Sequence, residues 1–360
     1  MKTILVINPG STSTKIAVFK DYEPFLQTNF KHSAEELEPY EHVVDQYDFR
    51  KQLILDYLKS NDFDLNTLDG IVVRGGLLGP IHAGAYEVNE DMIWQLKYRP
   101  MNEHAANVGP IIGLEIGKSL GIPAYIYDGI TVDEITPINK ITGLKEFRRK
   151  GLGHNLNTRA AAMLYATDKG IPYNELTLIV AHLGGGITVN LHHKGKIIDA
   201  IPDEEGPFSP ERSGGLPLFD VIKKCYDEGM TLDKMMKIVK RQGGLMSHLG
   251  TTECIDVEKM IADGDEHAKL IYDAMALNVA KNIAKCAPDV CGKVDAIVIT
   301  GGIAYSDYIT ESIKEKVSFI APVAVYPGED EMKALASGCI RVLNGKEQAR
   351  VYERIENPRG

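Results

Sequence analysis

Apolar residues in this chain gather in short runs that are separated by loops rich in glycine and hydroxyl residues. The first run covers residues 4–7, a small polar loop follows, and a second run covers residues 16–19. Runs of this length between Pro, Gly, Ser and Thr predict a β-hairpin and not a helix. The same plan returns at residues 178–191, where two apolar runs enclose three successive glycines.

The two predicted hairpins are separated by a constant interval. Gly10 and Gly184 are 174 residues apart, as are Val6 and Val180, in a chain of 360 residues. This interval is close to half of the chain, so it predicts a duplicated architecture. The acidic and aromatic segment 32–51 shows no clear period, and we expect a surface excursion there.

Two later apolar runs, at 123–127 and 294–299, each follow a predicted helix, over 111–120 and 268–287. Helices that alternate with strands imply an α/β sheet that is partly parallel. Ligands of such sheets bind at the carboxyl ends of the strands. We therefore expect one crevice to be faced by the residues that end or follow the apolar runs: Asn8, Asp128, His182 and Gly301.

The composition is that of a folded globular protein with an acidic balance. Hydrophobic residues make up 44% and charged residues 25%, and the formal net charge is −10, which together exclude an intrinsically disordered chain. A chain of 360 residues exceeds the size at which a single core stops growing, so we expect two domains. The acidic balance argues against nucleic acid or an anionic membrane as the main partner.

The cysteines and the N-terminus indicate where the protein works. Five cysteines without a Cys-x-x-Cys pair do not make a disulfide framework and favour a reducing cytosol. The apolar run at 4–7 is too short for a signal peptide, and no apolar stretch reaches the length of a membrane span. We therefore expect a cytoplasmic protein.

The loop at 8–15 has the composition of a phosphate-binding loop. Its backbone N–H groups, hydroxyls and one ammonium suit phosphate oxygens. The candidate ligands are Asn8, Ser11, Thr12, Ser13 and Lys15. A Walker A loop is excluded, because the Gly-Lys-Ser/Thr ending is missing and a strand follows in place of a helix. The alternative is a solvated hairpin turn.

Two glycine loops are further candidates for nucleotide binding. Three successive glycines let a backbone approach a phosphate closely, although a flexible hairpin is the alternative. The residues of this loop are His182, Gly184, Gly185 and Gly186. The second loop follows the run at 294–299 and suits the close approach of a flat nucleoside, with Gly301, Gly302 and Ile303.

Two arginines and two histidines complete the candidate chemistry. Arg74 and Arg212 each lie close to two glycines, so each offers a planar guanidinium to a carboxylate or phosphate with little steric hindrance. His104 and His154 lie in predicted loops. The alternatives are a surface charge for each arginine and a structural role for each histidine. No His and Cys residues have the spacing of a metal site.

Six motifs follow one another in the chain: NPGSTSTK at 8–15, NEHAAN at 102–107, YDGITVDE at 127–134, HLGGGITV at 182–189, ERSGG at 211–215 and TGGIA at 300–304. Together they resemble the superfamily of acetate and sugar kinases, chaperone ATPases and actin, and within it the acetokinase family. The resemblance implies an α/β fold of two duplicated actin-like (ribonuclease H-like) domains with an active-site cleft between them. These domains would cover 1–155 and 156–330, with the last helix, about 331–356, as a candidate addition to the first.

The resemblance also implies a reaction. It is the reversible transfer of a phosphoryl group from ATP, with Mg²⁺, to a short-chain carboxylate, with butyrate first and acetate, propionate or isobutyrate as alternatives. The family further implies a homodimer or a larger homo-oligomer. A zinc-containing sugar kinase is disfavoured, because its closely spaced cysteines are absent. An actin-like nucleotide switch without enzymatic activity is the alternative from another class.

The resemblance assigns nucleotide and metal contacts to the loops named above. Asn8 and the hydroxyls after it would reach the phosphates and Mg²⁺, and Glu331 would be the second carboxylate on the magnesium side. The loop 182–186 would cradle the β- and γ-phosphates, and residues 301–303 would flank the adenosine.

The resemblance assigns the remaining residues to the reacting groups. Asp128 would take the catalytic acidic position, and His154 and Arg212 would hold the transferring phosphoryl group. Arg74, with His104 nearby, would bind the substrate carboxylate from a position shifted relative to the acetate branch. Gly153 stands where that branch has an aromatic residue, which implies a deeper acyl pocket.

Overall fold

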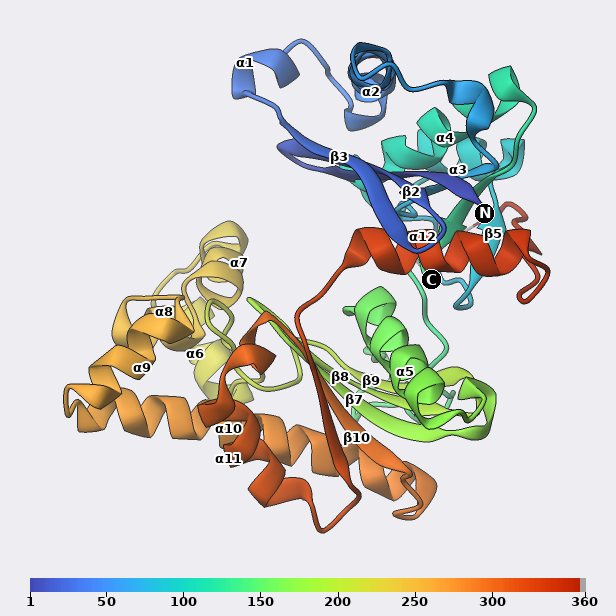
Figure 1. The fold of residues 1–360 in the computed structure, drawn as a ribbon. Helices are drawn as coiled ribbons and strands as arrows, with labels where there is room; N and C mark the ends of the chain where they lie inside the picture. Colours follow the sequence, from blue (N-terminus) through green and yellow to red (C-terminus); the bar gives the residue numbers. More distant parts are fainter. Residues whose placement is uncertain (357–360) are drawn as a thin grey trace. The chain divides into compact units, whose positions relative to one another are not determined.

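The computed structural model describes residues 1–356, and the apolar runs form the central strands of two separate sheets (Figure 1). The first sheet has the order β12-β5-β6-β4-β1-β2-β3. Its strands are β1 (Thr3–Gly10), β2 (Ser13–Lys20), β3 (Glu23–Lys31), β4 (Gly70–Val73), β5 (Ala85–Glu87), β6 (Ala124–Tyr127) and β12 (Arg350–Val351). The strand β2 is antiparallel to both of its neighbours, β1 and β3, whereas β1, β4 and β6 are parallel.

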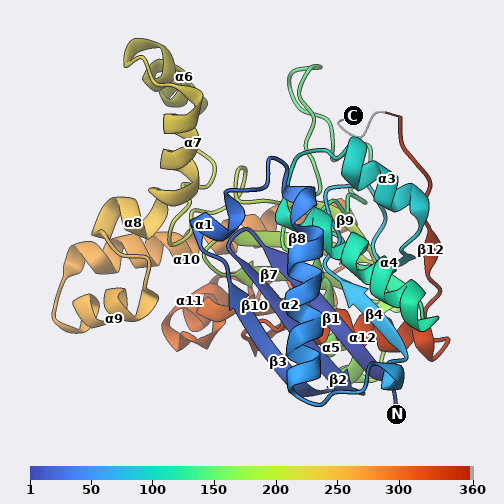
Figure 2. The ribbon, with the colours of Figure 1, turned by 90° about the horizontal axis from the view of Figure 1, so that it is seen from above.

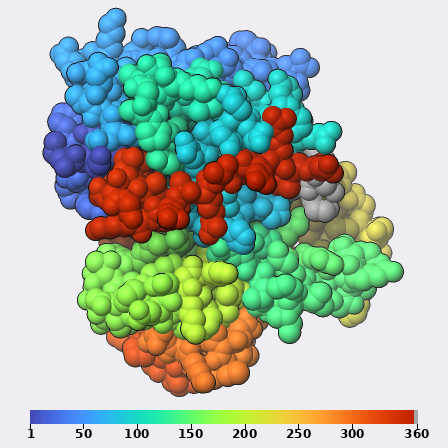
Figure 3. Space-filling view, turned by 90° about the vertical axis from the view of Figure 1, so that its right-hand side faces the viewer, coloured from blue at the N-terminus to red at the C-terminus, as the bar shows by residue number. Residues whose placement is uncertain are grey.

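Helices cover both faces of the first sheet (Figures 1 and 2). The helices are α1 (Ala34–Leu37), α2 (Tyr47–Ser60), α3 (Glu90–Tyr98), α4 (Val108–Leu120) and α12 (Glu331–Leu343). Helices α2 and α4 pack on the face that carries Leu5 and Ile7, because strand side chains alternate between the two faces. Helix α12 packs against β1 and β4, and Figure 3 shows the C-terminal segment in red beside the N-terminal residues in blue.

The second sheet has the order β11-β10-β7-β8-β9. Its strands are β7 (Thr177–Leu183), β8 (Ile187–His193), β9 (Lys196–Ile201), β10 (Ala296–Gly301) and β11 (Val323–Pro327). The strand β8 is antiparallel to both of its neighbours, β7 and β9, and β10 is parallel to both β7 and β11. The sequence β3-β2-β1-β4-β6 of the first sheet therefore corresponds to β9-β8-β7-β10-β11, which confirms the predicted duplicated α/β fold.

The helices of the second sheet are α5 (Asn155–Lys169), α6 (Leu218–Asp227), α7 (Leu232–Arg241), α8 (Gly244–Leu249), α9 (Cys254–Ala262), α10 (Glu266–Cys286) and α11 (Asp307–Val317). Helices α10 and α11 pack on the face that carries Ile179 and Ile297, and α5 packs on the opposite face beside Val180 and Val298. Within residues 1–356, no helix is both long and apolar enough to span a membrane.

The contacts of the chain divide it into two compact units. Unit 1 consists of Met1–Asp133 together with the residues from Asp330 onward, and unit 2 is Glu134–Glu329. The predicted domains, 1–155 and 156–330, stay a prediction; the division by contacts assigns residues 134–155 to unit 2.

The segment 32–51 differs from the surface excursion that its composition predicted. Residues 47 onward form α2, and His32, Gln46 and Arg50 are buried, with Arg50 fully inaccessible to solvent. The prediction is wrong for these three residues because His32 and Arg50 bond the β1–β2 hairpin, at Thr14 and Gly10, and Gln46 accepts from Arg50.

Candidate active site

In unit 1, three predicted site residues lie at the carboxyl ends of parallel strands. Asn8 lies near the end of β1, Arg74 directly follows β4, and Asp128 directly follows β6. The register pairs Ile7 with Val73 and Val73 with Ile126, so the three strands end at one edge of the sheet.

The first residue of α12 joins this edge. The Glu331 carboxylate accepts a hydrogen bond from Asn8 Nδ2 at 2.8 Å through Oε2 and one from Arg74 Nη1 at 2.9 Å through Oε1. Its side chain is about one-third exposed. The structure therefore brings together Asn8, Arg74 and Glu331 in unit 1.

His104 caps the short helix at Ala105–Asn107, and it is close enough to Arg74 for the positive charge of Arg74 to act on it. Its Nδ1 accepts a hydrogen bond from the Ala106 amide at 3.1 Å, so the neutral ring carries its proton on Nε2. Burial, and then the positive charge of Arg74, lowers the pKa of His104. His104 is therefore a neutral hydrogen-bond donor beside a guanidinium.

Asp128 has an unusual backbone conformation for a residue other than glycine. Its φ is 42°, in the left-handed region, and it is only 2% exposed. The Gly84 amide donates to Asp128 Oδ1 at 2.7 Å, and the Asp128 amide donates to the Gly84 carbonyl at 3.1 Å. Such strain costs about 1–3 kcal/mol and gathers at functional sites.

The hairpin that holds the first candidate phosphate loop is tighter than the sequence predicts. The strands β1 and β2 continue to the Gly10–Ser13 pair, so only Ser11 and Thr12 form the turn, and both are exposed. Lys15 pairs with Asn8 across the hairpin, and paired residues project to the same face.

In unit 2, the three glycines form the turn between β7 and β8, and the last of them makes room for an arginine. A Cβ at Gly186 would lie 2.7 Å from Nη1 of Arg212. Ser209 Oγ donates to the Gly185 carbonyl at 2.5 Å, and the Gly184 amide donates to the Gly186 carbonyl at 3.1 Å. The loop that carries Arg212 is therefore held against the glycine turn.

Arg212 is restrained by two carboxylates of its own loop. It forms an ion pair with Asp203 and has a longer contact of 3.8 Å with Glu211. Asp203 was not predicted, because no motif marks it, whereas Ser209 lies only two residues before the ERSGG motif.

The two candidate histidines of unit 2 stack on each other. The ring centroids of His154 and His182 are 4.3 Å apart, and His154 Nδ1 lies 2.8 Å from Thr188 Oγ1. Burial, and then the charge of His154, lowers the pKa of His182 to about 3. The ring of His182 is therefore neutral at neutral pH, and its 3.3 Å contact with Glu329 is not an ion pair.

The second glycine loop lies at the same edge of the unit 2 sheet as His182. Thr300 pairs with His182 in the parallel register. Gly301 has a φ of 94°, and a Cβ there would lie 2.3 Å from the Leu183 carbonyl oxygen. No atom lies within 4 Å of a Cβ at Gly302, and the next residue, Ile303, is buried. This loop requires Gly301 and leaves space at Gly302.

Gly153 has a spatial role that its sequence position did not reveal. Its φ is not in the left-handed region, but a Cβ there would lie 2.7 Å from Thr188 Cγ2. Thr188 was not predicted, although it lies in the HLGGGITV motif. A side chain at position 153 would collide with Thr188, which is the hydrogen-bond partner of His154. A substitution at Gly153 therefore changes the position of His154 and does not test the size of an acyl pocket alone.

We expect Gly153→Ala to lower kcat about 10-fold or more, because displacement of Thr188 releases His154 from its 2.8 Å contact. Steady-state kinetics of the phosphoryl transfer that the six motifs imply measures this effect. The double variant Gly153→Ala/Thr188→Ser removes the colliding methyl and keeps the hydroxyl, so it should recover most of the rate. Full activity of Gly153→Ala alone would contradict this account.

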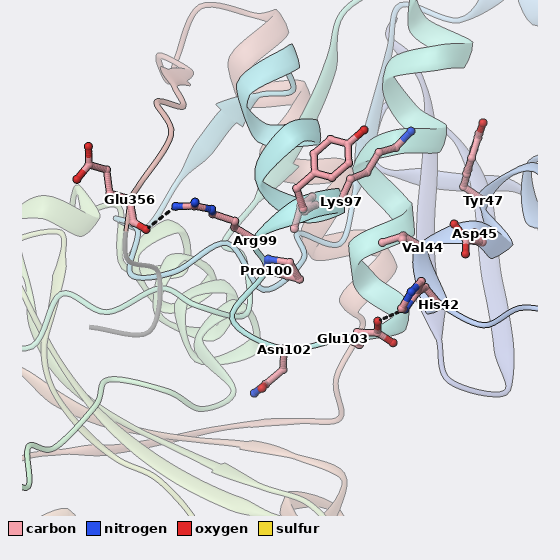
Figure 4. Close-up of a pocket in the computed structure, with 12 residues that line it drawn as sticks. His42, Val44, Asp45, Tyr47, Lys97, Arg99, Pro100, Asn102, Glu103 and Glu356 are labelled. Carbon is pink, nitrogen blue, oxygen red and sulfur yellow. Dashed lines mark hydrogen bonds and ion pairs between the residues drawn. The ribbon is translucent and has the colours of Figure 1, made fainter.

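A groove in unit 1 lies apart from all of these residues. It has a volume of about 890 Å³ and is lined mainly by the segments 42–47 and 96–103 (Figure 4). Its walls carry both signs of charge, including Lys97 and Arg99 against Asp45 and Glu103. None of the predicted site residues lines it.

The chain matches known proteins over almost its full length. Residues 138–330 match the model of the acetokinase family. Butyrate kinase 2 of Clostridium acetobutylicum is 47% identical over 352 residues, which cover 97% of this chain and 99% of that protein. Butyrate kinase 1 of the same organism is 44% identical over 355 residues, 98% of this chain and 100% of that protein.

Solved structures share the fold at lower identity. The Porphyromonas gingivalis acetate kinase superposes with a TM-score of 0.79 at 18% identity and covers 95% of this chain and 100% of its own. A propionate kinase from Francisella tularensis superposes with a TM-score of 0.74 at 19% identity, covering 94% of this chain and 99% of its own.

Proposed function

Because the chain belongs to the acetokinase family and is an ATP-dependent carboxylate kinase, we propose that butyrate is the acid that it phosphorylates, giving butyryl phosphate and ADP reversibly. The observation that carries this proposal is the 44–47% identity to two proteins named butyrate kinase over at least 97% of the chain.

Phosphoryl transfer to a carboxylate requires that the negative charge of the phosphates be neutralised, whereas it does not require a general base. A carboxylic acid of this kind has a pKa of about 4–4.5, so the nucleophile is already ionised at neutral pH. The barrier is the approach of an anion to the anionic γ-phosphate. Catalysis therefore comes from positioning and from donors aimed at the transferring group.

In unit 1, Arg74 binds the carboxylate of the acid. Its guanidinium has five N–H donors, and the Glu331 contact involves Nη1. The neutral His104 has its Nε2 proton available as a second donor. Asp128 has a carboxylate that Gly84 holds in place, and it orients the reacting groups without removing a proton from the acid.

In unit 2, the glycine turn holds the β- and γ-phosphates through its backbone N–H groups, and residues 301–303 flank the adenosine. Arg212 and His154 donate to the oxygens of the phosphoryl group in transfer, where charge is spread in the transition state. The His154 ring stacks on the neutral His182 ring, and this contact fixes the orientation of His154 toward the phosphoryl group.

The residues at Glu331 fit a magnesium ion. Mg²⁺ is commonly held by one or two carboxylates together with phosphate oxygens and water. Glu331 is a partly exposed carboxylate next to the Asn8 amide, and within residues 1–356 no set of three His, Cys, Asp or Glu side chains could hold a metal alone. When bound, the ion would neutralise phosphate charge.

We expect Glu331→Gln to raise the Mg²⁺ concentration needed for half-maximal rate, because it removes one negative charge and keeps the volume of the side chain. A magnesium titration of the initial rate measures this shift. An unchanged titration would leave Glu331 as a partner of Asn8 and Arg74 only.

An acyl-hydroxamate assay with ATP and a panel of acids tests the proposed substrate. Each buried methylene contributes about 0.8 kcal/mol, so butyrate, with two more than acetate, should be preferred about 15-fold in kcat/KM. A preference for acetate, propionate or isobutyrate would replace butyrate as the substrate. Nucleotide hydrolysis without acyl phosphate from any acid would favour the nucleotide switch.

A further inference from the structure

Arg50 of α2 is fully buried beneath the turn of the β1–β2 hairpin. Its guanidinium donates to three carbonyl groups of the turn region: Gly10 at 2.9 Å, Ser11 at 3.3 Å and Ser13 at 2.9 Å. The Thr12 carbonyl accepts instead from the His32 amide at 2.9 Å. Arg50 therefore holds every carbonyl from Gly10 to Ser13 except that of Thr12.

The remaining donors of Arg50 also meet neutral acceptors. They bond Thr14 Oγ1 at 2.9 Å and Gln46 Oε1 at 2.8 and 3.2 Å. No carboxylate of residues 1–356 forms an ion pair with this guanidinium, and burial lowers its pKa only to about 10. Arg50 is therefore a buried positive charge at neutral pH whose partners are hydrogen-bond acceptors without charge.

The geometry of the peptide bond fixes what the turn shows on its outer side. The described chain contains no cis peptide bond. In a planar trans peptide the carbonyl oxygen and the amide hydrogen point in opposite directions. Because the carbonyls of Gly10 and Ser11 point to Arg50, the amides of Ser11 and Thr12 point away from it. Successive outward amides form a concavity that binds anions.

We propose that Arg50 is a positioning residue that preorganises the 10–13 turn for phosphate. This inference rests on the proposed function, because it assumes that the turn meets the phosphates of ATP. Arg50 acts in two ways: it orients the outward amides, and its charge, which no carboxylate offsets, adds to the attraction for an anion beyond the turn.

The neighbouring His32 supports this arrangement. Thr14 Oγ1 accepts from Arg50, so its own hydrogen is available to His32 Nε2, which lies at 2.8 Å. Burial, and then the charge of Arg50, lowers the pKa of His32, which keeps its ring neutral at neutral pH. Contacts with both Arg50 and His32 therefore hold the Thr14 hydroxyl in β2, beside the turn.

Three variants and one matched control test the proposal. Arg50→Met removes the charge and the donors, Arg50→Lys keeps the charge without the planar fork, and Arg50→Ala leaves a space for a small cation. Arg341→Ala is the control, because Arg341 is also a partly buried arginine of unit 1 but is paired with Glu347 and Tyr127, away from the turn. The measurements are the Kd for ATP by calorimetry without any acid, the KM for ATP, and the Tm.

The expected result is a rise of about 10-fold to 10²-fold in the Kd and KM for ATP with Arg50→Met and a smaller rise with Arg50→Lys. Added guanidinium, well below denaturing concentrations, should restore ATP binding to Arg50→Ala, whereas urea, which is neutral and of similar shape, should not. Arg341→Ala should lower the Tm with the Kd for ATP unchanged.

An unchanged Kd for ATP in all three Arg50 variants, with only the Tm lowered, would overturn the proposal and leave Arg50 as a structural residue. Equal rescue by urea and guanidinium would overturn the role of its charge. The ATP titration needs no turnover, so a wild-type protein that binds ATP but phosphorylates no acid would refute the proposed function and still test Arg50.

Discussion

Replacement of Arg212 by alanine is expected to lower kcat about 10²–10³-fold and to leave the KM for ATP nearly unchanged. The guanidinium lies against Gly186 in the turn between β7 and β8, where the proposed function puts the β- and γ-phosphates. Charge on the transferring group differs most between ground state and transition state, so a donor there acts mainly on kcat. His154→Ala should show the same pattern.

The experiment compares Arg212→Ala with Arg212→Lys in steady-state kinetics. Lysine keeps the ion pair with Asp203 but lacks the planar fork, so a rate between wild type and alanine is expected. Circular dichroism and the Tm confirm that both variants are folded. Near-normal turnover of folded Arg212→Ala would reject its role in holding the phosphoryl group.

Gly186→Ala is expected to lower kcat about 10²-fold with little change in Tm. The added Cβ would lie 2.7 Å from Arg212 Nη1, the far end of a flexible side chain, so the guanidinium can move aside without a shift of the backbone. The protein then stays folded, but the Arg212 guanidinium is displaced from the position in which it would contact the transferring phosphoryl group.

A double-mutant cycle isolates this effect from a direct effect on the turn. In the Arg212→Ala background the added methyl has no guanidinium to displace, so Gly186→Ala should then change kcat little. Additive losses in the double variant would mean that Gly186 acts through the phosphate backbone contacts and not through Arg212.

The strand ends were accessible from sequence because they depend on local patterns. Short apolar runs that end in Asn8, Asp128, His182 or at Gly301 predict strands whose carboxyl ends carry polar groups, and the sheets form from these runs. The interval of 174 residues predicted the duplication for the same reason, since each half repeats the same hairpin.

Contacts between distant segments were not accessible in this way. Glu331 meets Asn8 across 323 residues, and no property of either local sequence indicates a partner so far away. Arg50 has the composition of a surface residue, and its burial depends on carbonyl groups that become available only when the hairpin folds over α2. Position 186 likewise requires glycine because of Arg212, which lies on another loop and occupies the space that a Cβ would need.

The placement of α12 sets an order for synthesis on the ribosome. Unit 2 is one continuous segment, whereas unit 1 lacks α12 until residues 331–343 have emerged. Leu335, Ala336 and Cys339 are fully buried in that helix, so nascent unit 1 exposes the apolar surface that they later cover. Unit 2, though made second, can therefore finish folding first. Glu331 is the first residue of the helix that completes unit 1. A chain that ends before this helix therefore lacks the carboxylate that contacts Asn8 and Arg74.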